Sequence, residues 1–206
     1  SRSEVASVLS GFPKFEDSCI GLPYGPRMPG HMVKETRKAI AIARKFNEKV
    51  ARPLALKLDR RTHEDPDFLP WDLIDEANRW GFYTMWIPKI FGGQGYNMPS
   101  SSFFLEEVAS ACAGIANVIG VHYLAVAGLV ASGNARISKR VLREVIDGEK
   151  SGKPCLLALA TTEPGAGTDV EEVELLDKGR VTCTARRVEG GYIVNGTKVF
   201  ISMGHV

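Results

Sequence analysis

The hydrophobic pattern of the chain changes near Gly148, from the spacing of helices to that of strands. Before this point, as in 134–148, apolar residues recur three and four positions apart, with Lys, Arg and Glu between them. After it, apolar and β-branched residues form short runs separated by turn residues. The chain is therefore expected to adopt an α+β fold, with an all-helical domain over 32–150 and the start of an antiparallel, barrel-like β domain over 151–206.

The first 31 residues fit neither pattern. They are dense in Gly and Pro, so we expect an extended arm over 1–31 that packs on this subunit or on a neighbour. The chain does not begin with Met and has no signal-peptide core, which indicates processing or trimming.

Helical spacing then dominates as far as Gly148. The expected helices run from Met32 past Pro53, over 71–80, from Pro99 towards Ser132, and over 134–148. Within the third stretch, Gly114 and Gly120 indicate either a break into two helices or close helix contacts. Pro53 should disturb the first helix, because proline cannot donate the backbone hydrogen bond. The polar stretch 60–66 should break the helix, and Gly92, Gly93 and Gly95 indicate a turn rather than a phosphate loop.

Composition excludes several classes of function. The formal net charge is +2, and no Lys/Arg cluster suggests a nucleic-acid partner. The four cysteines form no CxxC pair and the histidines have no ligand spacing, so no metal site is expected and a reducing compartment is favoured. No apolar run is expected to span a membrane.

Short strands and turns follow Gly148. An apolar run over 155–160 reads as a buried strand, and 180–186 as another. Two hairpins are expected, one turning at Glu189–Gly191 and one at Asn195–Gly196, with the last strand over 198–202. So short a sheet has open edges, and we expect further sequence or a companion chain to complete it.

The loop after the first expected strand, Thr161–Asp169, combines hydroxyls, a proline and two glycines. Exposed backbone N–H groups and hydroxyls at the end of a strand suit a polar, anionic ligand. An ordinary β-turn with a Pro-Gly corner is an equally good interpretation, since these are the usual turn residues.

Two motifs together are more specific than either alone. Thr162-Glu163-Pro164-Gly165-Ala166-Gly167-Thr168-Asp169 is followed by Asn195-Gly196-Thr197-Lys198-Val199-Phe200-Ile201-Ser202, behind a helical domain. In this order and at this separation they closely resemble the acyl-CoA dehydrogenase family. The stretch from Ile87 to Gly95 also resembles a loop of that family, so the resemblance covers roughly 32–206.

The resemblance implies FAD as cofactor and an acyl-CoA thioester as substrate. Members of the family remove hydrogens from the α and β carbons of the thioester, with the β hydride passing to flavin N5. It also implies a third, C-terminal helical domain that carries the catalytic base, so no catalytic residue is expected in this chain. Glu163 does not match the base and lies within the structure of its own loop.

The resemblance also assigns cofactor-binding positions. The flavin ring is expected along the segment of Leu159, Ala160, Thr161 and Thr162 and against Phe200, Ile201 and Ser202; the pyrophosphate and CoA are expected at Gly167 and Thr168. Thr168 is thus also a substrate-binding candidate. Phe200 stands where the family usually has Trp, Ser202 where it has Thr, and Leu159 where an aromatic residue is frequent. The first two changes preserve a ring and a hydroxyl.

Further expectations concern partners. The family resemblance implies an oligomer, homomeric or heteromeric, with electron-transfer flavoprotein as acceptor, in the cytoplasm or, in a eukaryote, the mitochondrial matrix. Two alternatives remain open: a non-catalytic subunit that assembles with active ones, and a related flavin oxidase. Residues around His122, Tyr123 and Leu124 either line an acyl pocket or fill the core, and core packing is favoured.

Overall fold

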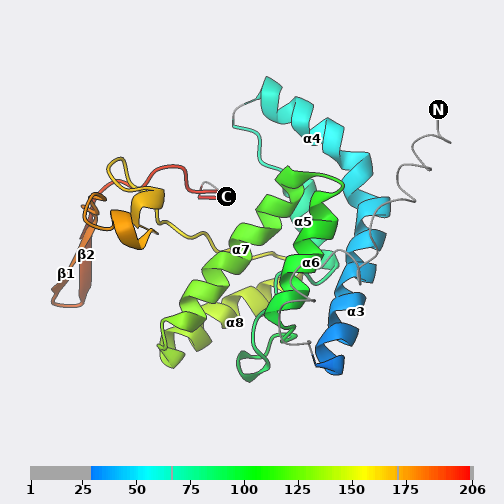
Figure 1. The fold of residues 1–206 in the computed structure, drawn as a ribbon, viewed down its shortest axis with the longest axis horizontal. Helices are drawn as coiled ribbons and strands as arrows, with labels where there is room; N and C mark the ends of the chain where they lie inside the picture. The colour runs from blue at the N-terminus through cyan, green and yellow to red at the C-terminus, as the bar shows by residue number, and fades with distance from the viewer. Residues whose placement is uncertain (1–28, 66, 171, 205–206) are drawn as a thin grey trace.

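The computed structural model describes residues 29–65, 67–170 and 172–204, so the expected N-terminal arm lies almost wholly outside the described residues. The helical part runs from Gly30 to Ser151, and the remaining chain holds one two-stranded antiparallel sheet. The helices gather on one side in Figure 1, and the strands lie apart from them on the other. The expected α+β architecture, a helical domain before the start of an antiparallel sheet, is confirmed.

The first helix is interrupted just before Pro53, as expected. Helix α3 (Gly30–Phe46) passes into a π-helical turn, η1 (Asn47–Ala51), and continues as α4 (Arg52–Glu64). A prolyl ring would clash with the carbonyl four residues earlier, and the wider turn relieves that clash. The expected break over 60–66 is wrong in its first part, because α4 continues to Glu64 and the Asp65 N–H still donates to the Arg61 carbonyl oxygen.

Short elements connect this helix to the centre of the domain. Helix α5 (Trp71–Arg79) ends just before Gly81, and the glycine-rich stretch forms a turn around the 3₁₀ helix η2 (Lys89–Phe91). Helix α6 (Met98–Ala109) begins at Asn97, whose side chain accepts a hydrogen bond from the Ser100 N–H. The turn at the glycines and the start of a helix near Pro99 both match the expectations.

Helix α7 (Ala113–Ala131) is the central helix and is almost free of charge. By length and composition it could cross a membrane, so the expectation that no run has that length is wrong. It nevertheless packs as a core helix of the bundle, with residues such as Ile119 and His122 fully buried. The expected stretch from Pro99 divides into α6 and α7 at Ser110–Cys112, so the break into two helices, one of the two interpretations of Gly114 and Gly120, occurs just before Gly114.

Helix α8 (Ala135–Ser151) continues past Gly148, where an end was expected. Gly148 is needed for a different reason: a Cβ on it would lie 2.6 Å from the Lys153 carbonyl oxygen of the chain that folds back over the helix. The chain leaves this helix through Gly152, in the left-handed conformation. Gly148 thus lets the connection to the β part lie close against α8.

An aromatic cluster joins these helices. The Phe82 ring lies 4.9 Å from that of Phe46 on α3 and 4.8 Å from that of Phe104 on α6, both edge to face. The Trp86 ring lies 4.1 Å from the Tyr123 ring on α7. Because Phe46, Phe82 and Phe104 are fully buried, the loop between α5 and α6 forms the centre of the core.

The β part contains one hairpin. Strands β1 (Thr184–Val188) and β2 (Gly191–Asn195) pair antiparallel through the expected turn at Glu189–Gly190, with Arg186 opposite Ile193. The short 3₁₀ helices η3 (Thr168–Val170) and η4 (Val173–Leu175) precede it. Apart from the Glu163–Ala166 bridge, no other strand pairing occurs in the described part of the chain.

Two expected strands are therefore wrong. Residues 155–160 are extended but unpaired, because no described segment offers them a backbone ladder. The second hairpin does not form, since the chain runs on after Gly196 without turning back on β2. Gly196 has φ 145°, and a Cβ there would lie 2.5 Å from the Cys183 Cα, so the glycine permits a close backbone approach rather than a turn.

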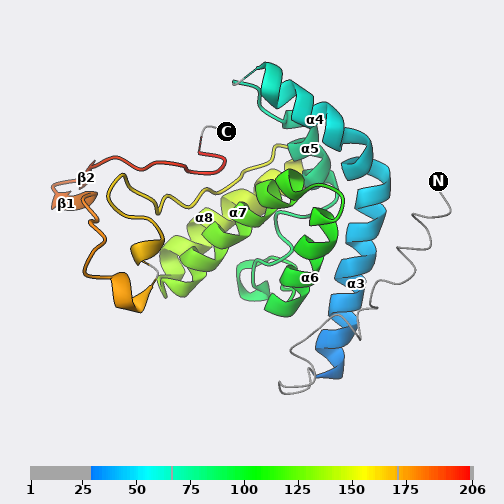
Figure 2. The same cartoon turned by 45° about the horizontal axis from the view of Figure 1, so that its top comes forward.

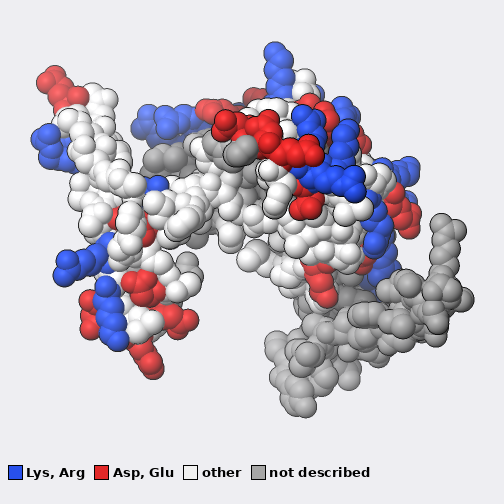
Figure 3. All heavy atoms as spheres, turned by 90° about the horizontal axis from the view of Figure 1, so that it is seen from above, with Lys and Arg blue, Asp and Glu red and all other residues white. Residues whose placement is uncertain are grey.

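The extended stretch after α8 connects the two parts. It runs beside α7 in Figures 1 and 2 before reaching the hairpin. In Figure 3, acidic and basic side chains are interspersed over the helices, with mostly uncharged atoms between the helical part and the hairpin. The face in that view gathers no charge of one sign over its described residues.

Candidate functional site

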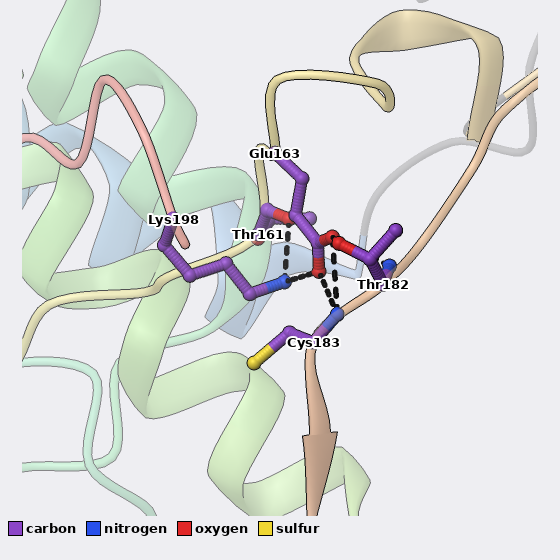
Figure 4. Close-up of polar contacts among 5 residues, drawn as sticks. All are labelled: Thr161, Glu163, Thr182, Cys183 and Lys198. Atoms are coloured by element: carbon purple, nitrogen blue, oxygen red, sulfur yellow. Dashed lines mark hydrogen bonds and ion pairs between the residues drawn. The ribbon is translucent and has the colours of Figure 1, made fainter. Parts of the chain in front are cut away.

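The two sequence motifs lie side by side in the β part. The Val199 N–H donates to the Thr162 carbonyl oxygen at 3.0 Å, and the Lys198 ammonium donates to the Thr161 carbonyl oxygen at 3.0 Å. Lys198 also forms an ion pair with Glu163 at 2.8 Å, which Figure 4 shows in the middle of the cluster. The junction thus brings together residues that lie more than thirty positions apart in the sequence.

The Glu163 carboxylate is the centre of this junction. Its side chain has no exposed surface, and it accepts hydrogen bonds from the Thr182 N–H at 2.6 Å, the Thr182 hydroxyl at 2.8 Å and the Cys183 N–H at 3.1 Å. The Lys198 ammonium, followed by the donors of Thr182 and Cys183, lowers the pKa of Glu163 to about 2. A carboxylate with these partners is a poor proton acceptor, so Glu163 has a structural role.

Pro164 and Gly165 form a tight turn. Glu163 and Ala166 exchange both backbone hydrogen bonds across it, at 2.9 and 3.1 Å. The Gly165 carbonyl accepts from the Arg180 N–H at 2.8 Å, which ties the turn to the start of the hairpin. The β-turn interpretation of this corner is therefore correct, and the segments on either side of the turn are the remaining candidates for ligand binding.

One flank is the segment expected along the flavin ring. Leu159, Ala160 and Thr161 are exposed and Thr162 is half-buried. Within the described residues, the N–H groups of all four and the Thr162 hydroxyl have no hydrogen-bond partner. This part of the backbone therefore presents a row of free donors at the surface.

The other flank, expected at the phosphates, is only partly free. The Gly167 N–H donates to the Asp169 carboxylate at 2.6 Å, so a negatively charged side chain already holds this donor. The exposed Thr168 hydroxyl has no partner in the described chain. Thr168 is thus available to an anion as the structure stands, whereas Gly167 requires Asp169 to release its N–H.

The second motif presents Phe200 outward. Its side chain is 91% exposed, and its φ of 56° lies in the left-handed region, which is uncommon for a residue other than glycine. Ile201 is half-buried, Ser202 is exposed, and no hydrogen bond is recorded for the Ser202 hydroxyl in the described residues. A strained backbone that exposes an aromatic ring is more typical of a binding surface than of a core.

His122 fills the core, as the favoured interpretation of this stretch expected, but its hydrogen bonds were not predicted. It lies on α7, fully buried, with Nε2 3.0 Å from the Tyr83 carbonyl oxygen and Nδ1 accepting from the Leu157 N–H at 3.0 Å. Burial lowers its pKa to about 4, so the ring is neutral. A polar side chain that is buried in an apolar helix needs hydrogen-bond partners, and that rule could have indicated that His122 has them.

An apolar groove runs between α6 and α7. It consists of two adjoining cavities of about 320 and 380 Å³, which share Met98, Ser101, Tyr123 and Ala127. Leu124 lines the smaller cavity, whereas His122 faces the core. Of the three residues considered for an acyl pocket, Tyr123 and Leu124 border this groove. Within the described residues, no cluster of side chains suits a metal ion.

Comparisons with known proteins agree with this architecture. The model of the acyl-CoA dehydrogenase N-terminal domain matches residues 34–149, more than half of the chain. The chain belongs to the acyl-CoA dehydrogenase family. This membership confirms the resemblance that the paired loop motifs indicated.

Individual relatives are longer. The chain is 32% identical to a probable medium-chain specific acyl-CoA dehydrogenase of Caenorhabditis briggsae, matching over 84% of this chain and 38% of that protein. It is 33% identical to the CarC subunit of the caffeyl-CoA reductase–Etf complex of Acetobacterium woodii, over 79% and 38%. The acyl-CoA dehydrogenase structure from Geobacillus kaustophilus aligns with a TM-score of 0.62 and 28% identity, over 83% of this chain and 40% of that one. The chain thus spans about two fifths of their length.

Proposed function

We propose that this chain supplies the helical domain and the flavin-binding edge of an FAD-dependent acyl-CoA dehydrogenase. The observation that carries the proposal is the junction of the two motifs, where Val199 and Lys198 bind the backbone of Thr162 and Thr161. This junction aligns the free donors of Leu159–Thr162 with the exposed Phe200–Ser202 segment. The reaction class proposed is α,β-dehydrogenation of an acyl-CoA thioester.

The free groups suit a flavin. FAD, when bound, supplies the hydride acceptor, flavin N5. The N–H groups of 159–162 and the Thr162 hydroxyl would bind the pyrimidine end of the ring, where donors stabilise the negative charge of the reduced form. Phe200 would cover a ring face, the Ser202 hydroxyl would lie near N5, and Thr168 would bind phosphate.

The acyl chain is proposed to bind in the groove between α6 and α7. The groove is lined mainly by apolar side chains, including Leu105, Val121 and Leu124, and it opens to the surface. Burial of methylene groups against such a surface is favourable by about 0.8 kcal/mol each.

The catalytic base is proposed to come from outside this chain. Glu163 is fully engaged by its four donors and has a lowered pKa, so it is unsuited to take the α proton. Electron-transfer flavoprotein is the proposed acceptor, supported by the relative named as part of a complex with Etf. An oligomer in the cytoplasm, or in the mitochondrial matrix of a eukaryote, is the proposed setting.

Co-expression with the C-terminal part of a family member tests this proposal. The purified product, called the completed protein below, is examined by absorbance and by acyl-CoA oxidation with an artificial electron acceptor. A yellow protein that bleaches on addition of acyl-CoA is expected. A soluble, folded complex without flavin would overturn the assignment. A flavin complex that oxidises no acyl-CoA would favour a non-catalytic subunit. Rapid reoxidation of the reduced flavin by air would favour an oxidase.

A further inference from the structure

We infer that His122 is a positioning residue for the flavin-binding edge: it holds the backbone at Leu157, and so fixes the segment that leads to Thr162 against the helical domain. The inference rests on the proposed function. It adds a residue of α7 that lies outside both loop motifs.

The hydrogen bonds of His122 determine its tautomer. A backbone N–H can only donate, so the Leu157 amide, 3.0 Å away, requires a lone pair on Nδ1. A carbonyl oxygen can only accept, so the Tyr83 oxygen, 3.0 Å from Nε2, requires the hydrogen there. The neutral ring with hydrogen on Nε2 is the only form that satisfies both partners. His122 therefore connects the loop after α5, helix α7 and the extended segment.

The connection has little redundancy. Among the described residues, the Leu157–His122 bond is the one recorded hydrogen bond between residues 154–160 and the helices. Otherwise only apolar contacts of the half-buried Cys155, Leu156 and Leu157 join this segment to the helical core. Apolar contacts are not directional, so they do not fix the position of the segment along the helices. The hydrogen bond at Leu157 is directional and does fix it. The free donors begin only two residues later, at Leu159.

The ring itself is held rigidly. His122 is completely buried, and the Tyr83 and Tyr123 rings pack on it with centroids at 5.2 and 5.9 Å. Tyr123 in turn donates to the Phe82 carbonyl oxygen at 2.8 Å, and Tyr83 to that of Ile74 at 3.0 Å. A side chain locked by its own neighbours can hold another segment to within a fraction of an ångström, which a mobile surface residue cannot.

Two substitutions separate positioning from simple core packing. In His122→Asn the amide oxygen takes the place of Nδ1 and keeps the bond to Leu157; in His122→Gln the amide nitrogen takes the place of Nε2 and keeps only the bond to Tyr83. Each variant leaves one buried backbone group without its partner, so both should lose similar thermal stability. Only His122→Gln should release the Leu157 amide to fast hydrogen exchange. In the completed protein it should weaken FAD binding about tenfold, while His122→Asn stays near wild type.

A second pair leaves His122 and the rings around it unchanged. Leu157→Pro removes the donor and leaves His122 intact, whereas Leu156→Pro removes a neighbouring half-buried leucine whose N–H has no partner among the described residues. Leu157→Pro should reproduce the FAD loss of His122→Gln, and Leu156→Pro should not.

Equal losses of FAD affinity within each pair would overturn the inference and leave His122 a core residue. Wild-type protein without FAD would instead overturn the proposed function. In that case the exchange rate of the Leu157 amide still decides whether His122 holds the segment.

Discussion

The Val199 N–H donates to the Thr162 carbonyl oxygen at 3.0 Å and brings the end of one motif onto the start of the other. Thr162 uses its carbonyl for this bond and keeps its N–H and hydroxyl without partners in the described chain. Its carbonyl side thus joins the motifs, and its N–H and hydroxyl side is the one proposed to bind the flavin.

Thr162→Val removes the hydroxyl and preserves the shape of the side chain and the backbone bond to Val199. In the completed protein we expect FAD affinity to fall about fivefold, the effect of one lost hydrogen bond, with thermal stability of the unliganded protein unchanged. Fluorescence titration of FAD measures the affinity. Thr184→Val, at an exposed position on β1, makes the same change away from the site and should leave affinity unchanged. Equal behaviour of the two variants would remove Thr162 from the site.

Lys198→Met removes the ammonium and leaves the buried Glu163 carboxylate with only its neutral donors. An uncompensated buried charge is strongly unfavourable, so we expect the contact between the loop at 161–166 and the segment at 198–199 to loosen. Limited proteolysis between Glu163 and Lys198 should become faster, while the helical part stays resistant. Lys198→Arg should restore much of the protection, and Lys178→Met, at an exposed position, should have no effect. Cleavage as slow as in wild type would show that the ion pair does not hold the junction.

Local rules account for much of the fold. Apolar spacing predicts most of the helical residues, Pro53 predicts a disturbance that the structure shows as a π-helical turn, and Glu189–Gly191 predicts the hairpin turn. The Asn195–Gly196 hairpin fails because the same glycine signal can arise from a close contact, here with Cys183. The expected strand at 155–160 is wrong because a β-strand requires a neighbouring strand to which its backbone hydrogen-bonds, and a local run of apolar residues does not show whether such a neighbour exists.

The candidate site, like the fold, was predictable only in part. Motif resemblance selects Thr162, Thr168 and Ser202, whose hydroxyls are free in the described structure. The Glu163–Lys198 ion pair joins residues 35 positions apart, and nothing in their local sequence predicts it. His122 likewise binds Leu157, also 35 positions away, through a backbone amide that carries no side-chain signal. Supporting contacts of this kind depend on the tertiary fold.

The stability of the chain should fall as the pH decreases from 6.5 to 4. Burial lowers the pKa of His122 from 6.5 to about 4, so in this window the unfolded chain binds a proton that the native ring does not. The native state is therefore fully favoured above pH 6.5 and loses about 3 kcal/mol of unfolding free energy by pH 4. Tyr83 and Tyr123, which pack on the ring, have raised pKa values and stay neutral there. Urea denaturation across this range should show the loss, and His122→Asn should lack it. Identical pH profiles would contradict the assignment.

Gly196→Ala tests whether the close approach to Cys183 holds the β part together. The substitution adds a Cβ at 2.5 Å from the Cys183 Cα, on a residue with φ of 145°, so both sterics and backbone strain oppose it. Gly190→Ala is the matched control, because Gly190 also has positive φ, 81°, but nothing within 4 Å of its Cβ position. Both variants carry a backbone cost of about 1 kcal/mol or more, and only Gly196→Ala should additionally separate Cys183 from the following segment. Faster labelling of the Cys183 thiol in Gly196→Ala than in Gly190→Ala is expected. Equal labelling would mean that Gly196 is required only for its positive φ and not for the close approach to Cys183.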